Sequence, residues 1–106
     1  MEIDANLVKK VTERILCAAS PKRIILFGSA AAGRMTTDSD IDLLVLKDSP
    51  CNSRHESVRL RRALGALGHP IDLIVMDTGR FEETKDVIGG IAYPAHKYGK
   101  VIYEAS

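Results

Sequence analysis

The sequence predicts a small α/β domain (α+β in the stricter sense) with a mixed sheet of about four strands flanked by helices. With 106 residues, 45% of them hydrophobic and 27% charged, the chain has the size and composition of a single globular domain over 1–106. Short apolar runs alternate with longer segments in which apolar residues recur at helical spacing. Two of the short runs carry acidic residues at or near their starts, and this unusual pattern is the first indication of function.

A helix is expected near the start, from an N-cap at Asp4 to a stop at Ser20-Pro21. The apolar stripe that predicts it consists of Leu7, Val8, Val11, Ile15 and Ala19. A strand buried on both faces is expected over 24–27, where the residues are apolar without interruption. Gly28-Ser29 ends this strand, and the alanines of 30–32 predict a short helix that Gly33 ends.

Two further strands carry carboxylates near their starts. In the strand predicted over 40–46, Asp40 and Asp42 point to one face and Ile41 points to the other, because side chains alternate along a strand. Asp72 has a comparable position in the strand predicted over 71–76. Acidic residues are disfavoured in strands and costly where they lose water. If the two strands are neighbours, the three aspartates form one cluster.

The other expected elements are a helix over 53–67, with Ser53 and Glu56 as a capping box, and a closing strand over 100–104. The helix is basic, with arginines at positions 54, 59, 61 and 62. Such faces are usually solvated, and a formal net charge of +1 does not favour nucleic acid as a direct partner. Over 81–98 the helical spacing is weak, because Gly89-Gly90 and Pro94 interrupt it.

The glycine turn and the aspartates together favour chemistry on a nucleoside triphosphate. Gly28 permits close approach to the backbone, and a helix that starts near Ser29 offers free amide groups to an anion. Carboxylate oxygens are the hard ligands that suit Mg²⁺ or Mn²⁺ rather than Zn²⁺. Simpler interpretations make Ser29 only a helix cap and the aspartates only solvated strand ends. The shared face of Asp40 and Asp42 favours the metal site.

A P-loop is the main competing motif. Residues 28–33 have its glycine spacing, but Arg34 and Met35 stand where it continues with Lys and then Ser or Thr. Asp48 and Asp77 follow apolar strands, as a Walker B acid would. A P-loop would nevertheless leave the aspartate cluster unexplained, so we reject it.

The sequence also indicates where the protein works. Its first residues lack the basic and apolar regions of a signal peptide, and its apolar runs are too short to span a bilayer. Cys17 and Cys51 are expected to be reduced thiols. We therefore expect a cytoplasmic protein without a membrane partner.

The pattern of Gly28-Ser29, Gly33 and then Asp40-Ile41-Asp42 resembles the signature of the DNA polymerase beta superfamily of nucleotidyltransferases. In length the chain is similar to its minimal nucleotidyltransferases, antitoxin-type proteins often encoded beside a HEPN-domain toxin. The resemblance covers 24–76 and extends in part to the final strand. It implies the fold described above, with ATP as substrate.

The resemblance also implies residue roles. Gly28 and Ser29 would hold the β- and γ-phosphates of ATP, with Gly33 and Arg34 beside them in the nucleotide site. The metal ligands would be Asp40, Asp42 and Asp72. The first two would bind both Mg²⁺ ions, and Asp72 would join them at one ion and help to deprotonate the attacking hydroxyl. Relatives commonly carry Arg at the position of Ala32, for which Arg34 substitutes only in part.

The function that follows is Mg²⁺-dependent transfer of AMP from ATP to a tyrosine hydroxyl of a partner HEPN toxin, which the protein thereby silences. A chain of this size is too small for a separate acceptor-binding domain. We therefore expect a partner to dock on the surface formed by 81–98. The sequence is compatible with either a homo-oligomer or a hetero-oligomer. One alternative is an antitoxin that acts by binding with little or no catalysis, which Ala32 supports. Another is the catalytic subunit of a small-molecule nucleotidyltransferase, which the absence of a helical substrate domain disfavours.

Overall fold

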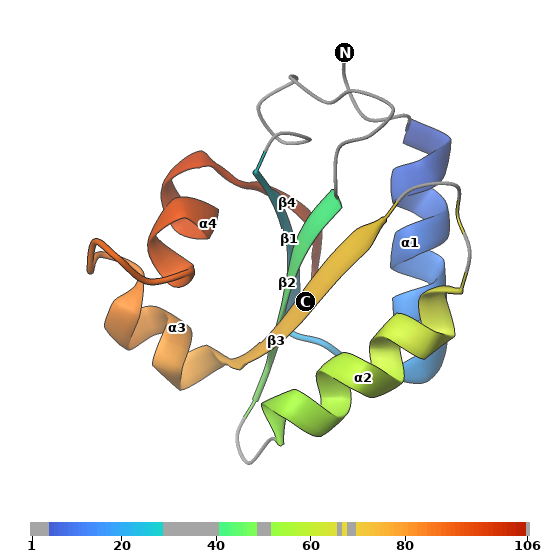
Figure 1. Ribbon diagram of the computed structural model, residues 1–106, viewed down its shortest axis with the longest axis horizontal. Coiled ribbons are helices and arrows are strands. Elements are labelled where there is room, and N and C mark those ends of the chain that lie inside the picture. Colours follow the sequence, from blue (N-terminus) through green and yellow to red (C-terminus); the bar gives the residue numbers. More distant parts are fainter. Residues whose placement is uncertain (1–4, 29–40, 49–51, 66, 68–69, 106) are drawn as a thin grey trace.

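The computed structural model describes residues 5–28, 41–48, 52–65, 67 and 70–105. Its elements in chain order are α1 (Ala5–Ala18), β1 (Arg23–Phe27), β2 (Ile41–Lys47), α2 (Ser53–Leu64), β3 (Ile71–Asp77), α3 (Thr78–Thr84), α4 (Ala92–Tyr98) and β4 (Lys100–Glu104). Figure 1 shows the sheet between two layers of helices, with α1 and α2 on one side and α3 and α4 on the other. This arrangement confirms the predicted fold class.

The sheet has four strands in the order β3-β2-β1-β4. β1 is antiparallel to both β2 and β4, whereas β2 and β3 are parallel, so the sheet is mixed as predicted. The antiparallel pairing places the end of β1 beside the start of β2. Parallel strands need a crossover, and α2 supplies it between β2 and β3.

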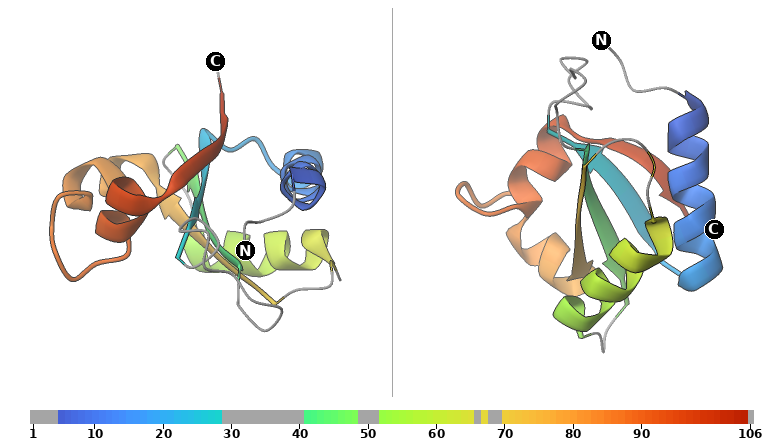
Figure 2. Two further views of the ribbon diagram at one scale, coloured as in Figure 1. Left: turned by 90° about the horizontal axis from the view of Figure 1, so that it is seen from above. Right: turned by 45° about the vertical axis from the view of Figure 1, so that its right-hand side comes forward.

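Two apolar cores, one on each face, hold the helices to the sheet. Their residues alternate along the strands, so that Leu43 belongs to the α1/α2 core and Leu44 to the α3/α4 core. Burial on both faces explains why residues 24–27 of β1 and 43–46 of β2 are apolar without interruption. The view from above in Figure 2 separates the two helical layers clearly.

The helix α2 differs from the prediction at both ends. Its N-cap is Asn52, not Ser53, because the Asn52 side chain accepts a hydrogen bond of 3.1 Å from the amide of His55. Glu56 does not complete a capping box, since its carboxylate binds Lys47 and Arg59 instead. The helix ends at Leu64 and not near residue 67, because Gly65 takes a left-handed conformation with φ of 63°.

The weakly patterned region 81–98 contains most of two short helices. Asp77 caps α3 by accepting hydrogen bonds from the amides of Gly79 and Arg80. Pro94 lies in the first turn of α4, where a missing amide is tolerated. Gly99 ends α4 in a tight place, since a Cβ there would overlap the carbonyl oxygen of Ala95. None of the helices in the described ranges combines the length and apolar character needed to cross a membrane.

Candidate active site

The two described aspartates of the predicted cluster lie side by side. β2 and β3 are neighbours, and Asp42 is the register partner of Asp72. Both side chains are on the same face as Leu44 and Ile74, which pack in the α3/α4 core. Adjacent strands are about 4.8 Å apart, so the two carboxylates start from backbone positions that can serve one ion or a pair of ions.

Gly28 lies at the same end of the sheet as the two aspartates. It follows β1, whose last residue, Phe27, is the register partner of Asp42. Its φ of 76° is in the left-handed region. A Cβ at residue 28 would overlap Oδ2 of Asp42, so any other residue there would displace that carboxylate. Gly28 therefore has a structural role beside the phosphate-binding role that the sequence predicts.

The two aspartates differ in their surroundings. Asp42 is half-buried, whereas the side chain of Asp72 is 52% exposed. Arg61 of α2 reaches Asp72, with 3.1 Å between Nη2 and Oδ1. Two carboxylates on one face, near each other and open to water on one side, are a donor set that fits Mg²⁺ or Mn²⁺.

The other predicted site residues lie outside the described part of the chain. They are Ser29, Gly33, Arg34 and Asp40, together with Ala32. Among the residues that the structure does describe, no three side chains of His, Cys, Asp or Glu are grouped to hold a metal ion. The structure thus describes two of the three predicted metal ligands, Asp42 and Asp72, but not the third, Asp40.

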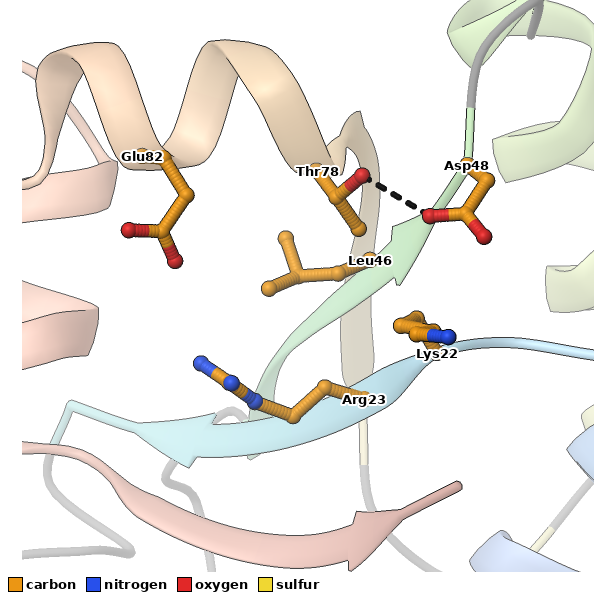
Figure 3. Close-up of a pocket in the computed structure, with 6 residues that line it drawn as sticks. All are labelled: Lys22, Arg23, Leu46, Asp48, Thr78 and Glu82. Carbon is orange, nitrogen blue, oxygen red and sulfur yellow. Dashed lines mark hydrogen bonds between the residues drawn. The ribbon is translucent and has the colours of Figure 1, made fainter. Parts of the chain in front are cut away.

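A cleft of about 200 Å³ lies at the opposite end of β2, and Figure 3 shows its lining. It is formed by Lys22, Arg23, Leu46, Asp48, Thr78 and Glu82. The Thr78 hydroxyl donates a hydrogen bond of 3.0 Å to Asp48. Because Asp48 binds Thr78 and Asp77 caps α3, both acids that resembled a Walker B residue have structural partners.

Glu56 is the centre of a charged cluster that the sequence did not predict. Its carboxylate accepts hydrogen bonds from Lys47 at 2.8 Å and from Arg59 at 2.6 Å. These two cations, Arg59 above all, lower the pKa of Glu56 to about 2. The cluster joins the end of β2 to α2: the Glu56–Arg59 pair has the i, i+3 spacing of a helix, whereas the contact of Glu56 with Lys47 is not signalled by the local sequence.

Comparisons with known proteins agree with this architecture. The model of the nucleotidyltransferase domain family matches residues 6–93. A protein from Sulfolobus solfataricus, whose solved structure is described as a nucleotidyltransferase, aligns with a TM-score of 0.64 at 19% identity over 93% of this chain and 78% of its own. A toxin-antitoxin structure with AMP-PNP aligns with a TM-score of 0.60 at 22% identity, over 93% and 74% of the two chains. No curated protein sequence is significantly similar to this chain.

At these identities the two structural likenesses show the fold alone. The family model, in contrast, spans more than half of the chain and includes β1, Gly28, β2 and β3. It thus covers both described aspartates and the glycine beside them. The chain belongs to the nucleotidyltransferase domain family, which agrees with the predicted resemblance to minimal nucleotidyltransferases.

Proposed function

We propose that this protein transfers AMP from ATP to a tyrosine hydroxyl of a partner HEPN toxin, and that it acts as the antitoxin of that pair in the cytoplasm. The observation that carries the proposal is the in-register pair of Asp42 and Asp72 beside Gly28. Carboxylate oxygens that project from the same face of adjacent strands are hard ligands that suit Mg²⁺ or Mn²⁺. The family of the chain makes a divalent metal and a nucleotide the natural occupants.

The metal ligands in this proposal are Asp42, Asp72 and Asp40. Bound ions would lower the pKa of the hydroxyl that attacks the α-phosphorus, and would offset the charge of the triphosphate and of the pyrophosphate that leaves. The aspartates would orient the reactants in line, and Asp72, the more exposed of the described pair, would accept the proton of the hydroxyl. Gly28, Ser29, Gly33 and Arg34 would bind the nucleotide phosphates, chiefly through backbone amides and the guanidinium group.

An apolar surface on the α3/α4 side of the sheet supports a protein partner. Between α3 and α4 the side chains of Val87 and Ile88 are 56% and 80% exposed, and Ile91 is also exposed. This segment lies on the α3/α4 side of the sheet, the side to which Asp42 and Asp72 project. Clustered exposed apolar residues are typical of interaction sites. One of the structural neighbours is a toxin-antitoxin structure with AMP-PNP, which agrees with such a partner.

The test uses ATP labelled at the α-phosphate, Mg²⁺ and the purified product of the adjacent gene. We expect label on that protein, removed by substituting its acceptor tyrosine. Asp42→Asn should reduce transfer by about 10²–10³-fold, because it removes a charged metal ligand worth several kcal/mol in the transition state. Far-UV circular dichroism should show an unchanged fold, since Asn is isosteric with Asp.

Two results would contradict the proposal in different ways. Full activity of Asp42→Asn would remove the metal-site assignment. Tight complex formation without any labelled product would instead establish an antitoxin that acts by binding alone, the alternative that Ala32 supports. Label on a small molecule, and none on the partner, would point to a different acceptor.

A further inference from the structure

The outer edge of β3 is covered by two side chains of α2. β3 is an edge strand, with β2 on one side only. On its other side the Ser57 hydroxyl accepts a hydrogen bond of 3.0 Å from the amide of Val75. One helical turn later, Nε of Arg61 donates a hydrogen bond of 3.2 Å to the carbonyl of Leu73. The i, i+4 spacing on α2 therefore matches the two-residue spacing on β3.

Arg61 contacts both the backbone and a side chain of β3, whereas Ser57 contacts the backbone of β3. Its second donor, Nη2, contacts Oδ1 of Asp72 at 3.1 Å, while Nε is held by the backbone of the next residue, Leu73. The guanidinium group is planar and rigid, so fixing one N–H direction also fixes the other. The backbone of β3 thus sets the position of the cation that touches the Asp72 carboxylate.

We propose that Arg61 is the positioning residue of the site, holding the carboxylate of Asp72 in a metal-binding orientation. The proposal rests on the function proposed above, in which Asp72 is a ligand. With 52% of its side chain exposed, Asp72 has little packing to restrict its rotation, and the bridge from Arg61 replaces that packing. Groups that orient a metal ligand typically change metal affinity by about 10–100-fold when they are removed.

The role depends on geometry as well as on charge. A lysine at position 61 would keep the positive charge, but a flexible ammonium group does not reproduce the planar fork that joins the Leu73 carbonyl to Asp72. Ser57→Ala offers the matched control, because it removes a hydrogen bond from the same strand edge and leaves Asp72 untouched.

The experiment measures binding of Mn²⁺ to the purified protein by electron paramagnetic resonance of the free ion, without nucleotide or partner. We expect Arg61→Gln and Arg61→Lys each to weaken binding by about tenfold or more, and Ser57→Ala to change it less than twofold. In an Asp72→Asn background, Arg61→Gln should have no further effect, because a positioning residue acts only through its ligand. Urea unfolding of each variant reports any loss of stability.

The outcomes separate the two proposals. Binding by the wild type with no loss in Arg61→Gln, an equal loss in Ser57→Ala, or full rescue in Arg61→Lys would overturn the positioning role and leave the metal site intact. An undiminished effect of Arg61→Gln in the Asp72→Asn background would also overturn it. Failure of the wild type to bind Mn²⁺ would overturn the metal site itself and the positioning role with it.

Discussion

Carboxylates are paired differently at the two ends of β2. At the end where the strand finishes, Lys47 and Arg59 both bind Glu56, whose side chain is only 16% exposed. At the start, Asp42 and Asp72 lie next to each other in register, and Arg61 contacts Asp72. One carboxylate with two cations makes a closed cluster, whereas the aspartate end brings two carboxylates together in register, of which Asp72 contacts a guanidinium group.

Under the proposed function, this difference separates charge that stabilises the fold from charge that serves the reaction. The closed cluster lowers the pKa of Glu56 to about 2 and links β2 to α2, which are consequences for stability. The paired aspartates gain nothing for the fold from their proximity, because like charges on adjacent strands repel. We therefore expect substitutions at the Glu56 end to change the free energy of unfolding, and substitutions at the aspartate end to change activity.

The strongest test of this contrast is Gly28→Ala. Alanine at φ of 76° is strained by about 1–2 kcal/mol, and its Cβ would overlap Oδ2 of Asp42, so the carboxylate must move. A displacement of about 1 Å in a catalytic group can cost about 10²-fold in rate, and we expect a loss of transfer of that size. The labelled-ATP assay described above provides the measurement.

Gly90→Ala is the control for this substitution. A Cβ at Gly90 meets nothing within 4 Å, so the variant should keep the stability of the wild type. Wild-type transfer by Gly28→Ala would show that the position of Asp42 beside this glycine is not needed for the reaction.

Glu56→Gln tests the closed cluster. At pH 7 the substitution removes the charge that binds Lys47 and Arg59, and should cost about 1–2 kcal/mol in the free energy of unfolding. The pKa of Glu56 is lowered from 4.5 to about 2 in the folded protein, so its stabilisation is fully present above pH 4.5. It is lost as the pH falls from 4.5 towards 2, and the difference from wild type should shrink over that interval.

Urea unfolding at pH 7 and at pH 3 measures this effect. Glu83→Gln, on the exposed surface of α3, is the matched control and should behave as the wild type at both pH values. Transfer activity of Glu56→Gln should stay near the wild-type level. A difference between Glu56→Gln and wild type that does not depend on pH would show that the carboxylate is not the stabilising group.

The sequence predicted the aspartate end better than the Glu56 end, for a physical reason. The tripeptide Ile-Asp-Leu occurs at 41–43 and at 71–73, and these two segments are register partners in the sheet. A strand pattern fixes which face a residue points to, so the shared face of Asp42 and Asp72 follows once their strands are neighbours. The glycine turn after β1 was likewise apparent from local pattern alone.

Contacts between distant elements were not predictable in this way. The helix α2 was interpreted as a basic, solvated face, yet Arg61 binds Asp72 of β3 and Glu56 binds Lys47 of β2. Asn52 and Ser53 are both good N-caps, and only the backbone conformation selects Asn52. The contacts of Arg61 and Glu56 with the strands depend on where α2 lies against the sheet, which the local sequence does not encode.

The smallest expected effect on the fold concerns the apolar surface between α3 and α4. Ile88 is 80% exposed, so Ile88→Ser should change the free energy of unfolding by less than about 0.5 kcal/mol. If this surface binds the partner, the loss of a buried isoleucine should weaken the complex by about 1 kcal/mol or more, near fivefold in Kd. Calorimetric titration of the partner gives that constant.

Val58→Ser is the control, because Val58 is an exposed apolar residue of α2, on the other side of the sheet. Equal weakening by both substitutions, or by neither, would place the partner elsewhere and separate docking from the face that carries Asp42 and Asp72.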